Sequence, residues 1–298
     1  MTATPTALRL WLALRARLEA AGTPQPDEDA TALVAAALGT HSSTIRWLDD
    51  VPEEQVAVGH RLCARRAEGE PLAYVLGTME FRGLTLSVDE RVLVPRRKTE
   101  SLAVLAAEEL CKLLTGRDLV RIADIGTGSG AVLLSMLATV RGHTGRVRAY
   151  GLDCSHDALD VARANAASLG LDAPVRWLRG DLVAPLSQRV HLMTVNLPYL
   201  PAAEVSAPPP ETLREPTEAV FGGGSTGMDT LRRFYAAAPG KVTADGVCLA
   251  EIPEAHAEEL HAAALAGFRS AELLADLSGV PRLLLARCSR DTDVEEGL

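Results

Sequence analysis

The feature that most constrains the fold is an alternation beginning at residue 119, where short apolar runs take turns with segments of helical periodicity. A glycine-rich loop follows the first apolar run. Strands are predicted at 120–125, 147–152, 175–178, 192–195 and 247–252, with two more near 271–274 and 282–286. Helices are predicted at 132–138 and 158–168. This alternation predicts an α/β fold with a mostly parallel, seven-stranded sheet covered by helices on both faces.

The rest of the chain follows other patterns. Apolar residues at helical spacing over 6–21, and further helices predicted over 29–38 and 53–67, indicate a small helical domain in residues 1–70. Residues 71–98 include an alternating stretch with a glycine at a turn position, which predicts a linking β-hairpin. Residues 99–289 open with a helix and carry the α/β unit, and residues 290–298 form an acidic tail.

Composition excludes several classes of protein. The net charge of −9 argues against binding long nucleic acid, because phosphate contacts dominate that affinity. The five cysteines include no Cys-x-x-Cys pair, so we expect no metal site and no disulfide framework. Neither a signal peptide nor an apolar run of membrane-spanning length is present, so we expect a cytoplasmic protein that does not enter a membrane. We expect it to be a monomer or a weak dimer.

The glycine-rich loop reads Asp124-Ile125-Gly126-Thr127-Gly128-Ser129-Gly130 and connects a predicted strand to a helix. Its glycines let the backbone turn sharply and approach a ligand closely. No Lys-Ser/Thr pair ends the loop, which argues against a phosphate-binding P-loop. Asp124 would repel a pyrophosphate, but it can accept hydrogen bonds beside a cationic amino acid group. The loop is therefore a candidate site for the methyl donor S-adenosylmethionine.

Two further carboxylates end the next strands. Asp153 follows roughly 20 residues after the glycine loop, where a carboxylate can accept both hydroxyls of a ribose. NAD and S-adenosylmethionine both carry that ribose, but the G-x-x-G step of the dehydrogenase pattern is absent. Asp181 and Leu182 follow the third strand and are predicted to meet the adenine. The combined pattern resembles that of the class I S-adenosylmethionine-dependent methyltransferase fold.

The motif Asn196-Leu197-Pro198-Tyr199 ends the fourth predicted strand, at the sheet edge where open α/β folds bind ligands. An amide or aromatic amine nitrogen is a poor nucleophile and must be held with its lone pair toward the methyl group. The Asn196 side-chain oxygen can accept one N–H, and the carbonyl of Leu197 can accept the other. Pro198 restricts the turn, and the Tyr199 ring can lie against the planar acceptor. Asn196 and Tyr199 are the predicted catalytic residues, and Asn196 also borders the predicted cofactor site.

The whole chain resembles the HemK/PrmC family, protein-(glutamine-N5) methyltransferases that modify the Gly-Gly-Gln motif of peptide chain release factors. The resemblance rests on the glycine loop, the Asn196 motif and further stretches: Pro71-Leu-Ala-Tyr-Val-Leu-Gly77, Val94-Pro95-Arg96, Thr99-Glu100 and Glu215-Pro216-x-x-Ala219-Val-Phe-Gly-Gly223. It implies an S-adenosyl-L-methionine cofactor, a release factor recognised by the helical domain, and a methyltransferase catalytic domain over 99–289. It also implies substrate-binding roles for Arg96, Arg97, Lys98 and Glu100.

Three departures from the family pattern leave the methyl acceptor open. Leu197 stands where the family has the first proline of Asn-Pro-Pro-Tyr, and Arg97-Lys98 replaces Pro-Glu. The segment 251–256 reads Glu-Ile-Pro-Glu-Ala-His in place of Glu-x-Gly-x-x-Gln. One alternative is the same scaffold acting on a small amide, amine or acid, since Arg97 and Lys98 would suit an anionic substrate. Minor alternatives are an adenine-N6 RNA methyltransferase and a non-catalytic binding module.

Overall fold

The structure is a computed structural model that describes residues 6–206 and 214–288. The predicted acidic tail at 290–298 lies outside the described residues. The chain divides into two compact units. Of the described residues, the smaller unit contains 6–78 and Arg214, and the larger contains 79–206 and 215–288. No helix within the described ranges is long and apolar enough to cross a membrane.

The N-terminal unit is built from α1 (Ala7–Ala20), α2 (Pro26–Leu38) and α3 (Glu53–Ala67), with the 3-10 turn η1 (Ser42–Trp47) between the last two. Its core consists of the apolar faces of these helices, including Leu10, Leu14, Leu18, Leu33, Val34 and Cys63. One buried ion pair joins two of the helices, with Arg66 Nε donating to Asp29 Oδ2 over 2.6 Å. Three amphipathic segments thus form the helical unit, as their periodicity predicts.

A short helix that the sequence pattern did not indicate precedes the predicted hairpin. Helix α4 (Leu72–Leu76) begins after Pro71 and ends at Gly77, which has a left-handed φ of 73°. The hairpin follows as β1 (Thr78–Phe81) and β2 (Leu84–Ser87). Its two-residue turn, Arg82-Gly83, has positive φ at both positions, which matches the twist of paired strands. A five-residue apolar run does not distinguish helix from strand by periodicity, so α4 could not be recognised from the pattern alone.

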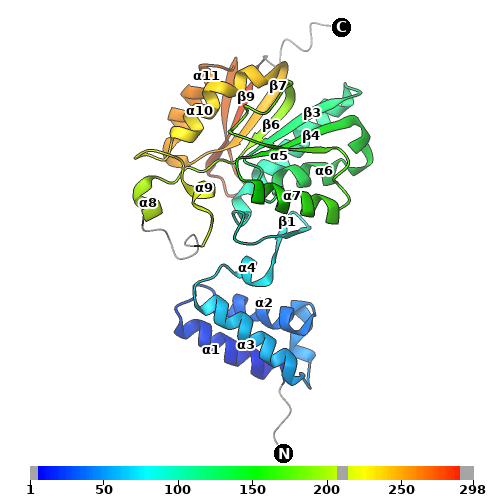
Figure 1. Ribbon diagram of the computed structural model, residues 1–298, viewed down its shortest axis with the longest axis vertical. Coiled ribbons are helices and arrows are strands. Elements are labelled where there is room, and N and C mark those ends of the chain that lie inside the picture. The colour runs from blue at the N-terminus through cyan, green and yellow to red at the C-terminus, as the bar shows by residue number, and fades with distance from the viewer. Residues whose placement is uncertain (1–5, 207–213, 289–298) are drawn as a thin grey trace, which may run out of the picture. The chain divides into compact units, whose positions relative to one another are not determined.

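The larger unit contains a seven-stranded sheet in the order β5-β4-β3-β6-β7-β9-β8 (Figure 1). Its strands are β3 (Val120–Ile125), β4 (Val147–Asp153), β5 (Val175–Arg179), β6 (Val190–Val195), β7 (Val242–Glu251), β8 (Ser270–Ala275) and β9 (Pro281–Arg287). The strands β3 to β7 pair in parallel, whereas β9 pairs antiparallel with both β7 and β8. The sheet is mostly parallel with seven strands, which confirms the predicted fold class.

Helices cover both faces of this sheet, as alternate side chains of the strands require (Figure 1). On one face α5 (Glu100–Thr115) and α6 (Ala131–Thr139) share a core with Ile122. On the other face α10 (Asp229–Ala237) and α11 (Ala257–Leu265) share a core with Ala123 and Ile125. Helix α7 (His156–Ser168) packs against β4 and β5. The shorter elements are η2 (Arg97–Thr99), η3 (Arg141–Arg146), α8 (Ala202–Ser206), α9 (Thr217–Val220), η4 (Ala238–Lys241) and η5 (Glu254–His256).

The strand order reverses between β3 and β6. From β3 the chain adds β4 and β5 in one direction, and it then returns to place β6 on the other side of β3. In open α/β sheets, ligands bind at the carboxyl ends of the strands at such a switch point. The glycine loop follows β3 and the Asn196 motif follows β6. The topology therefore brings the two predicted motifs to the same edge.

Candidate active site

The glycine loop makes the tight turn that its sequence predicts. Gly126, Gly128 and Gly130 have φ values of 69°, 53° and 84°, which side chains disfavour. A Cβ on Gly126 would also lie 3.1 Å from the Leu197 side chain, so the loop needs glycine there for close packing as well as for its backbone angle. The loop therefore presents bare backbone to a ligand at the switch point.

A buried asparagine fastens this loop to the β-hairpin. The Asn165 amide nitrogen donates to the carbonyl oxygens of Ser129 and Ser87, each over 3.0 Å. The backbone N–H of Ser87 returns a hydrogen bond to Asn165 Oδ1 over 2.7 Å. Because Asn165 is fully buried and its amide is satisfied on both sides, it fixes the far side of the glycine loop.

Asp124 is a buried carboxylate at the end of β3, with an exposed fraction of 3%. It accepts hydrogen bonds from the hydroxyls of Thr127 and Thr194, each over 2.7 Å. Thr194 is its neighbour across the parallel register of β3 and β6. Burial raises the pKa of Asp124 to about 6, although the two hydroxyls act in the opposite direction. A buried carboxylate with a raised pKa gains from a nearby cation, as the sequence prediction for a cationic ligand requires.

Asp153 ends β4, and its carboxylate is directed to the glycine loop. The backbone N–H of Gly128 donates to Asp153 Oδ2 and that of Ser155 donates to Oδ1, each over 3.0 Å. Burial raises the pKa of Asp153, and the hydrogen bonds from these backbone groups act in the opposite direction. An oxygen of a carboxylate accepts more than one hydrogen bond, so the hydroxyls of a ribose can be accommodated beside the backbone donors.

One cavity of about 320 Å³ joins these elements, a volume at the lower end of the range for small-molecule sites. The predicted residues that line it are Gly126, Gly128, Asp153, Asp181, Leu182, Asn196, Leu197 and Pro198. Asp124, Thr127, Ser129 and Gly130 do not line the cavity, and of these all but Gly130 are buried polar residues that support the loop. The residues predicted to bind the methyl donor thus form two groups, those that line the cavity and those that support the lining residues from behind.

Asp181 has a partner that the sequence pattern did not indicate. Its exposed carboxylate forms an ion pair with Arg233 of α10, and both residues line the cavity. Leu182 follows with a positive φ of 48°, an uncommon conformation for a residue with a branched side chain. Any contact between the Asp181 carboxylate and an adenine amino group would share this carboxylate with Arg233.

The side chain of Asn196 is oriented by Thr99, a buried residue of η2. Asn196 Nδ2 donates to Thr99 Oγ1 over 3.1 Å. Among the described residues no group donates to Asn196 Oδ1. Anchoring one end of the amide in this way leaves its acceptor oxygen for a ligand at the cavity wall. Thr99 was not a predicted site residue.

Tyr199, the last residue of the Asn196 motif, is hydrogen-bonded to Lys98 of η2. Lys98 Nζ donates to the Tyr199 hydroxyl oxygen and lies 3.4 Å from Glu251 Oε1. Glu251 ends β7 and is 1% exposed. Burial of the ammonium acts to lower the pKa of Lys98, but the Tyr199 hydroxyl and the Glu251 carboxylate outweigh it, so the pKa is raised. Lys98 is therefore a cation with two partners, in contrast to the free positive charge that the sequence suggested.

The turn that carries Tyr199 is held by a second glycine segment. A Cβ on Gly222 would lie 2.5 Å from Tyr199 Cα, and one on Gly227 would lie 2.0 Å from the Tyr199 carbonyl oxygen. Leu200 N–H donates to Val220 O over 2.9 Å, and Gly222 N–H donates to Leu200 O over 3.0 Å. Only glycine permits this approach, so the segment fixes the backbone of the motif from behind.

The other three residues predicted at the acceptor side differ in their surroundings. Arg96 donates to Glu215 Oε2 over 2.5 Å, and Glu215 Oε1 accepts from Val94 N–H over 3.2 Å. Arg96 therefore ties its segment to the chain after the Asn196 motif. Arg97 is exposed, and Glu100 is the half-buried first residue of α5. None of the three lines the cavity.

Five buried polar residues that support the site were not among those predicted: Thr99, Asn165, Thr194, Glu215 and Glu251. Thr99, Glu215 and Glu251 occur within stretches compared with the HemK/PrmC family, but nothing in their own pattern distinguished them from ordinary surface residues. Thr194 could have been found by aligning the ends of β3 and β6, since it directly faces Asp124.

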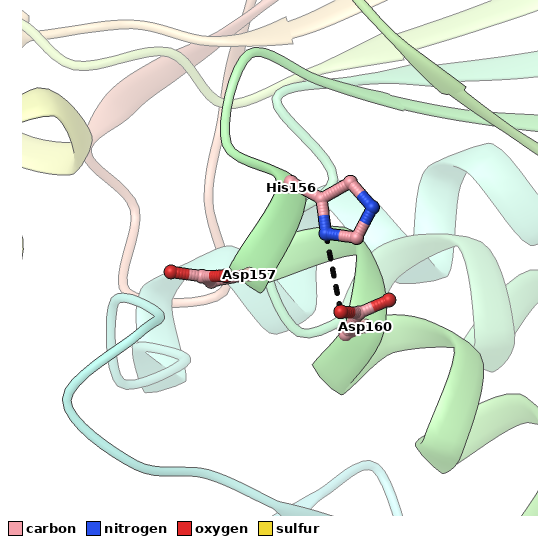
Figure 2. A group of neighbouring side chains, drawn as sticks. All are labelled: His156, Asp157 and Asp160. Atoms are coloured by element: carbon pink, nitrogen blue, oxygen red, sulfur yellow. Dashed lines mark ion pairs between the residues drawn. The ribbon is translucent and has the colours of Figure 1, made fainter.

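A separate cluster of titratable residues, His156, Asp157 and Asp160, lies at the start of α7 (Figure 2). Their potential ligand atoms lie within 4.8 Å of one another, and His156 Nδ1 is 3.2 Å from Asp160 Oδ2. Asp160 also pairs with Arg163. Acidic side chains at a helix N-terminus are stabilised by the helix dipole. We therefore interpret the group as a solvated ion-pair cluster and assign no metal to it.

The catalytic domain of hMettl16, solved in complex with the MAT2A 3′UTR hairpin 6, shares the fold with a TM-score of 0.53. The two are 15% identical over 77% of this chain and 83% of that one. The sheet order, with the glycine loop and the Asn196 motif at its switch point, is that of the class I methyltransferase fold.

Sequence comparison defines the family within that class. Residues 10–77 match the PrmC N-terminal domain. The release factor glutamine methyltransferase of Deinococcus radiodurans is 35% identical over 274 residues, which cover 91% of this chain and 95% of that protein. The enzyme of the same description from Bradyrhizobium diazoefficiens is 35% identical over 92% of each chain. The chain belongs to the release factor glutamine methyltransferase family, which confirms the resemblance seen in its motifs.

Proposed function

We propose that the protein transfers a methyl group from S-adenosylmethionine to the side-chain nitrogen of a glutamine in a peptide chain release factor. The observation that carries this proposal is a cavity lined by both predicted halves of the site. Gly126, Gly128 and Asp153 contribute one half, and Asn196, Leu197 and Pro198 contribute the other. Family membership supports the acceptor.

The residues around the cavity suit S-adenosylmethionine. The glycine loop presents bare backbone to the cavity at Gly126 and Gly128, and the buried Asp124 favours a cation beside it. In this proposal Asp153 meets the ribose and Leu182 meets the adenine. Asp181 can meet the adenine only by sharing its carboxylate with Arg233. When bound, S-adenosylmethionine supplies an electrophilic methyl group on a positively charged sulfur.

The acceptor side orients a weak nucleophile. Asn196 Oδ1 accepts one N–H of the glutamine amide and the carbonyl of Leu197 accepts the other, so that the nitrogen lone pair faces the methyl carbon. The Tyr199 ring lies against the planar amide. As the N–C bond forms, the sulfur–carbon bond breaks, and the nitrogen releases a proton to solvent. Lys98 is held as an ammonium by Glu251 and Tyr199 and does not act as the base. Positioning supplies most of the rate enhancement.

The pairing of Lys98 favours this acceptor over an anionic small molecule. The alternative of a small acid rests on free positive charge at Arg97 and Lys98. Glu251 neutralises Lys98 in the structure, which leaves only the exposed Arg97. We assign recognition of the release factor to the helical domain in residues 1–70, and we expect a cytoplasmic monomer or weak dimer.

The test is transfer of labelled methyl from S-adenosylmethionine to a purified bacterial release factor, with mass spectrometry to locate the label. The matched control is the same factor with the glutamine of its Gly-Gly-Gln motif replaced by glutamate. We expect one methyl on the glutamine and none on the control factor. Equal labelling of both factors, or none of either, would contradict the proposed acceptor.

A further inference from the structure

The Tyr199 hydroxyl acts as a hydrogen-bond acceptor toward Lys98, and this fixes which role its own hydrogen can take. Lys98 Nζ donates to this oxygen, and an ammonium group has only donors and no acceptor. A phenol hydroxyl carries one hydrogen of its own, and that hydrogen cannot be directed to the ammonium. Among the described residues no group accepts a hydrogen bond from the Tyr199 hydroxyl. Its own hydrogen is therefore available to an acceptor outside the chain.

Glu251 keeps Lys98 in this role. Its carboxylate is buried, and neither of its oxygens has a hydrogen-bond partner in the described part of the chain. Lys98 Nζ, 3.4 Å from Oε1, is its counter-charge. Another cation of this region, Arg282, donates to Asp276 Oδ2 over 2.8 Å. Lys98 is thus the cation that bonds to the Tyr199 hydroxyl, and Glu251 holds it there by charge.

We propose that Lys98 is a positioning residue that turns the Tyr199 hydroxyl into a hydrogen-bond donor toward a carbonyl oxygen of the acceptor peptide. This inference rests on the proposed function and deepens it. Asn196 Oδ1 then accepts a hydrogen bond from an N–H of the acceptor, while the Tyr199 hydroxyl donates one to an oxygen of the acceptor. The motif thus contacts both a donor and an acceptor group of the substrate. The hydroxyl contributes to acceptor binding, and the ring contributes to alignment.

The first test measures this division in steady-state kinetics with the release factor as varied substrate. Tyr199→Phe removes the donor but keeps the ring, so it should raise KM for the factor roughly tenfold, as expected for one hydrogen bond, with kcat nearly unchanged. Tyr199→Ala should lower kcat as well. Lys98→Met should raise KM as Tyr199→Phe does, and the double variant should be no worse than either single one. Lys98→Arg should restore most of the wild-type KM.

Loss of Lys98 also leaves a buried carboxylate without its counter-charge, so Lys98→Met is measured both alone and together with Glu251→Gln. A matched control is Lys112→Met, which removes an exposed lysine of α5 that pairs with Glu109. If Lys98→Met lowered only thermal stability and left KM for the factor unchanged in the Glu251→Gln background, the positioning role would be wrong. Additive KM effects of Lys98→Met and Tyr199→Phe would also contradict it.

The second test does not depend on the acceptor. A neutron structure of the wild-type protein should show three hydrogens on Lys98 Nζ, one of them directed at the Tyr199 oxygen, with the phenolic hydrogen pointing elsewhere. A phenolic hydrogen directed at Lys98 Nζ would overturn the inference even if the release factor is methylated. Absence of methylation with the expected hydrogen positions would instead refute the proposed function.

Discussion

The two halves of the cavity are built in different ways. The donor half uses the glycine loop and Asp153, which lie within one strand–loop–helix–strand stretch. The Asp153 carboxylate accepts hydrogen bonds from backbone N–H groups of Gly128 and Ser155 in that stretch. The acceptor half uses the side chain of Asn196, which lines the cavity, and that of Tyr199, which follows in the motif but does not line it. Residues of η2, 97 and 101 positions away in the sequence, hold these two side chains. The donor half is therefore fixed mainly by local contacts, with Thr194 and Asn165 as more distant supports, and the acceptor half depends on contacts between segments far apart in the sequence.

This difference predicts separable functions. A change on the acceptor side should alter turnover or acceptor binding and leave donor binding intact, because the glycine loop is supported independently by Asn165. A change on the donor side should act mainly on donor affinity. Four substitutions or conditions test this separation, beginning with the largest expected effect.

Replacing Asn196 with Ala should lower kcat by about 10²–10³-fold, since it removes a preorganised partner of the reacting group. The dissociation constant for S-adenosylmethionine, measured by calorimetry, should change little. A comparable loss of donor affinity would mean that Asn196 is chiefly structural, and the two halves would not be separable.

Replacing Asp153 with Ala should weaken S-adenosylmethionine binding by about 10–100-fold, the effect of losing charge-assisted hydrogen bonds. Asp153→Asn is the matched control, because it keeps the shape and one acceptor oxygen. Calorimetry measures both affinities, and a thermal melt reports the contribution of the bonds from Gly128 and Ser155 to stability. Unchanged donor affinity in the Ala variant would remove Asp153 from the ribose site.

Replacing Thr99 with Val should lower kcat by roughly tenfold, because Asn196 loses the hydrogen bond that orients its amide. Thr99→Ser keeps the hydroxyl and should stay close to the wild type. Donor affinity should be the same in all three proteins. If the Val and Ser variants had equal turnover, the orientation of Asn196 would have another cause.

Donor affinity should fall as the pH drops through about 6. Burial raises the pKa of Asp124 to about 6, and a bound cation favours the carboxylate form, so affinity is full above this pH and declines below it. The loss should be less than about tenfold at one pH unit below. Burial also raises the pKa of Asp153, which acts in the same direction. Calorimetry from pH 5 to 8 measures the effect, and Asp124→Asn should flatten the curve.

The same carboxyl group affects folding in the opposite sense. Its native pKa lies above the ordinary value of 3.8, so between these two values the native state binds a proton that the unfolded chain has released. The contribution of Asp124 to stability is therefore largest at acid pH and is lost as the pH rises through about 6.

The difference between the halves also explains how far the sequence could be interpreted. The fold class followed from the alternation of strands and helices and from the glycine positions. The glycine loop, Asp153 and Asn196 lie at or directly after the carboxyl ends of strands, and these ends meet at one edge of the sheet. Thr99 and Glu251 could not be recognised from the sequence. Thr99 contacts Asn196, and Glu251 contacts Lys98, only once the folded sheet brings these distant segments together. Lys98 was predicted at the acceptor side, but its neutralisation by a buried carboxylate was invisible in the sequence.

The most direct test of the central claim is a structure of the protein with S-adenosylhomocysteine and a Gly-Gly-Gln peptide. We expect the glutamine side-chain nitrogen within hydrogen-bond distance of Asn196 Oδ1 and of the Leu197 carbonyl oxygen, about 3 Å. We also expect the thioether sulfur on the opposite side of that nitrogen. A glutamine side chain bound away from Asn196, or a cofactor outside the cavity beside Gly126 and Asp153, would contradict the account.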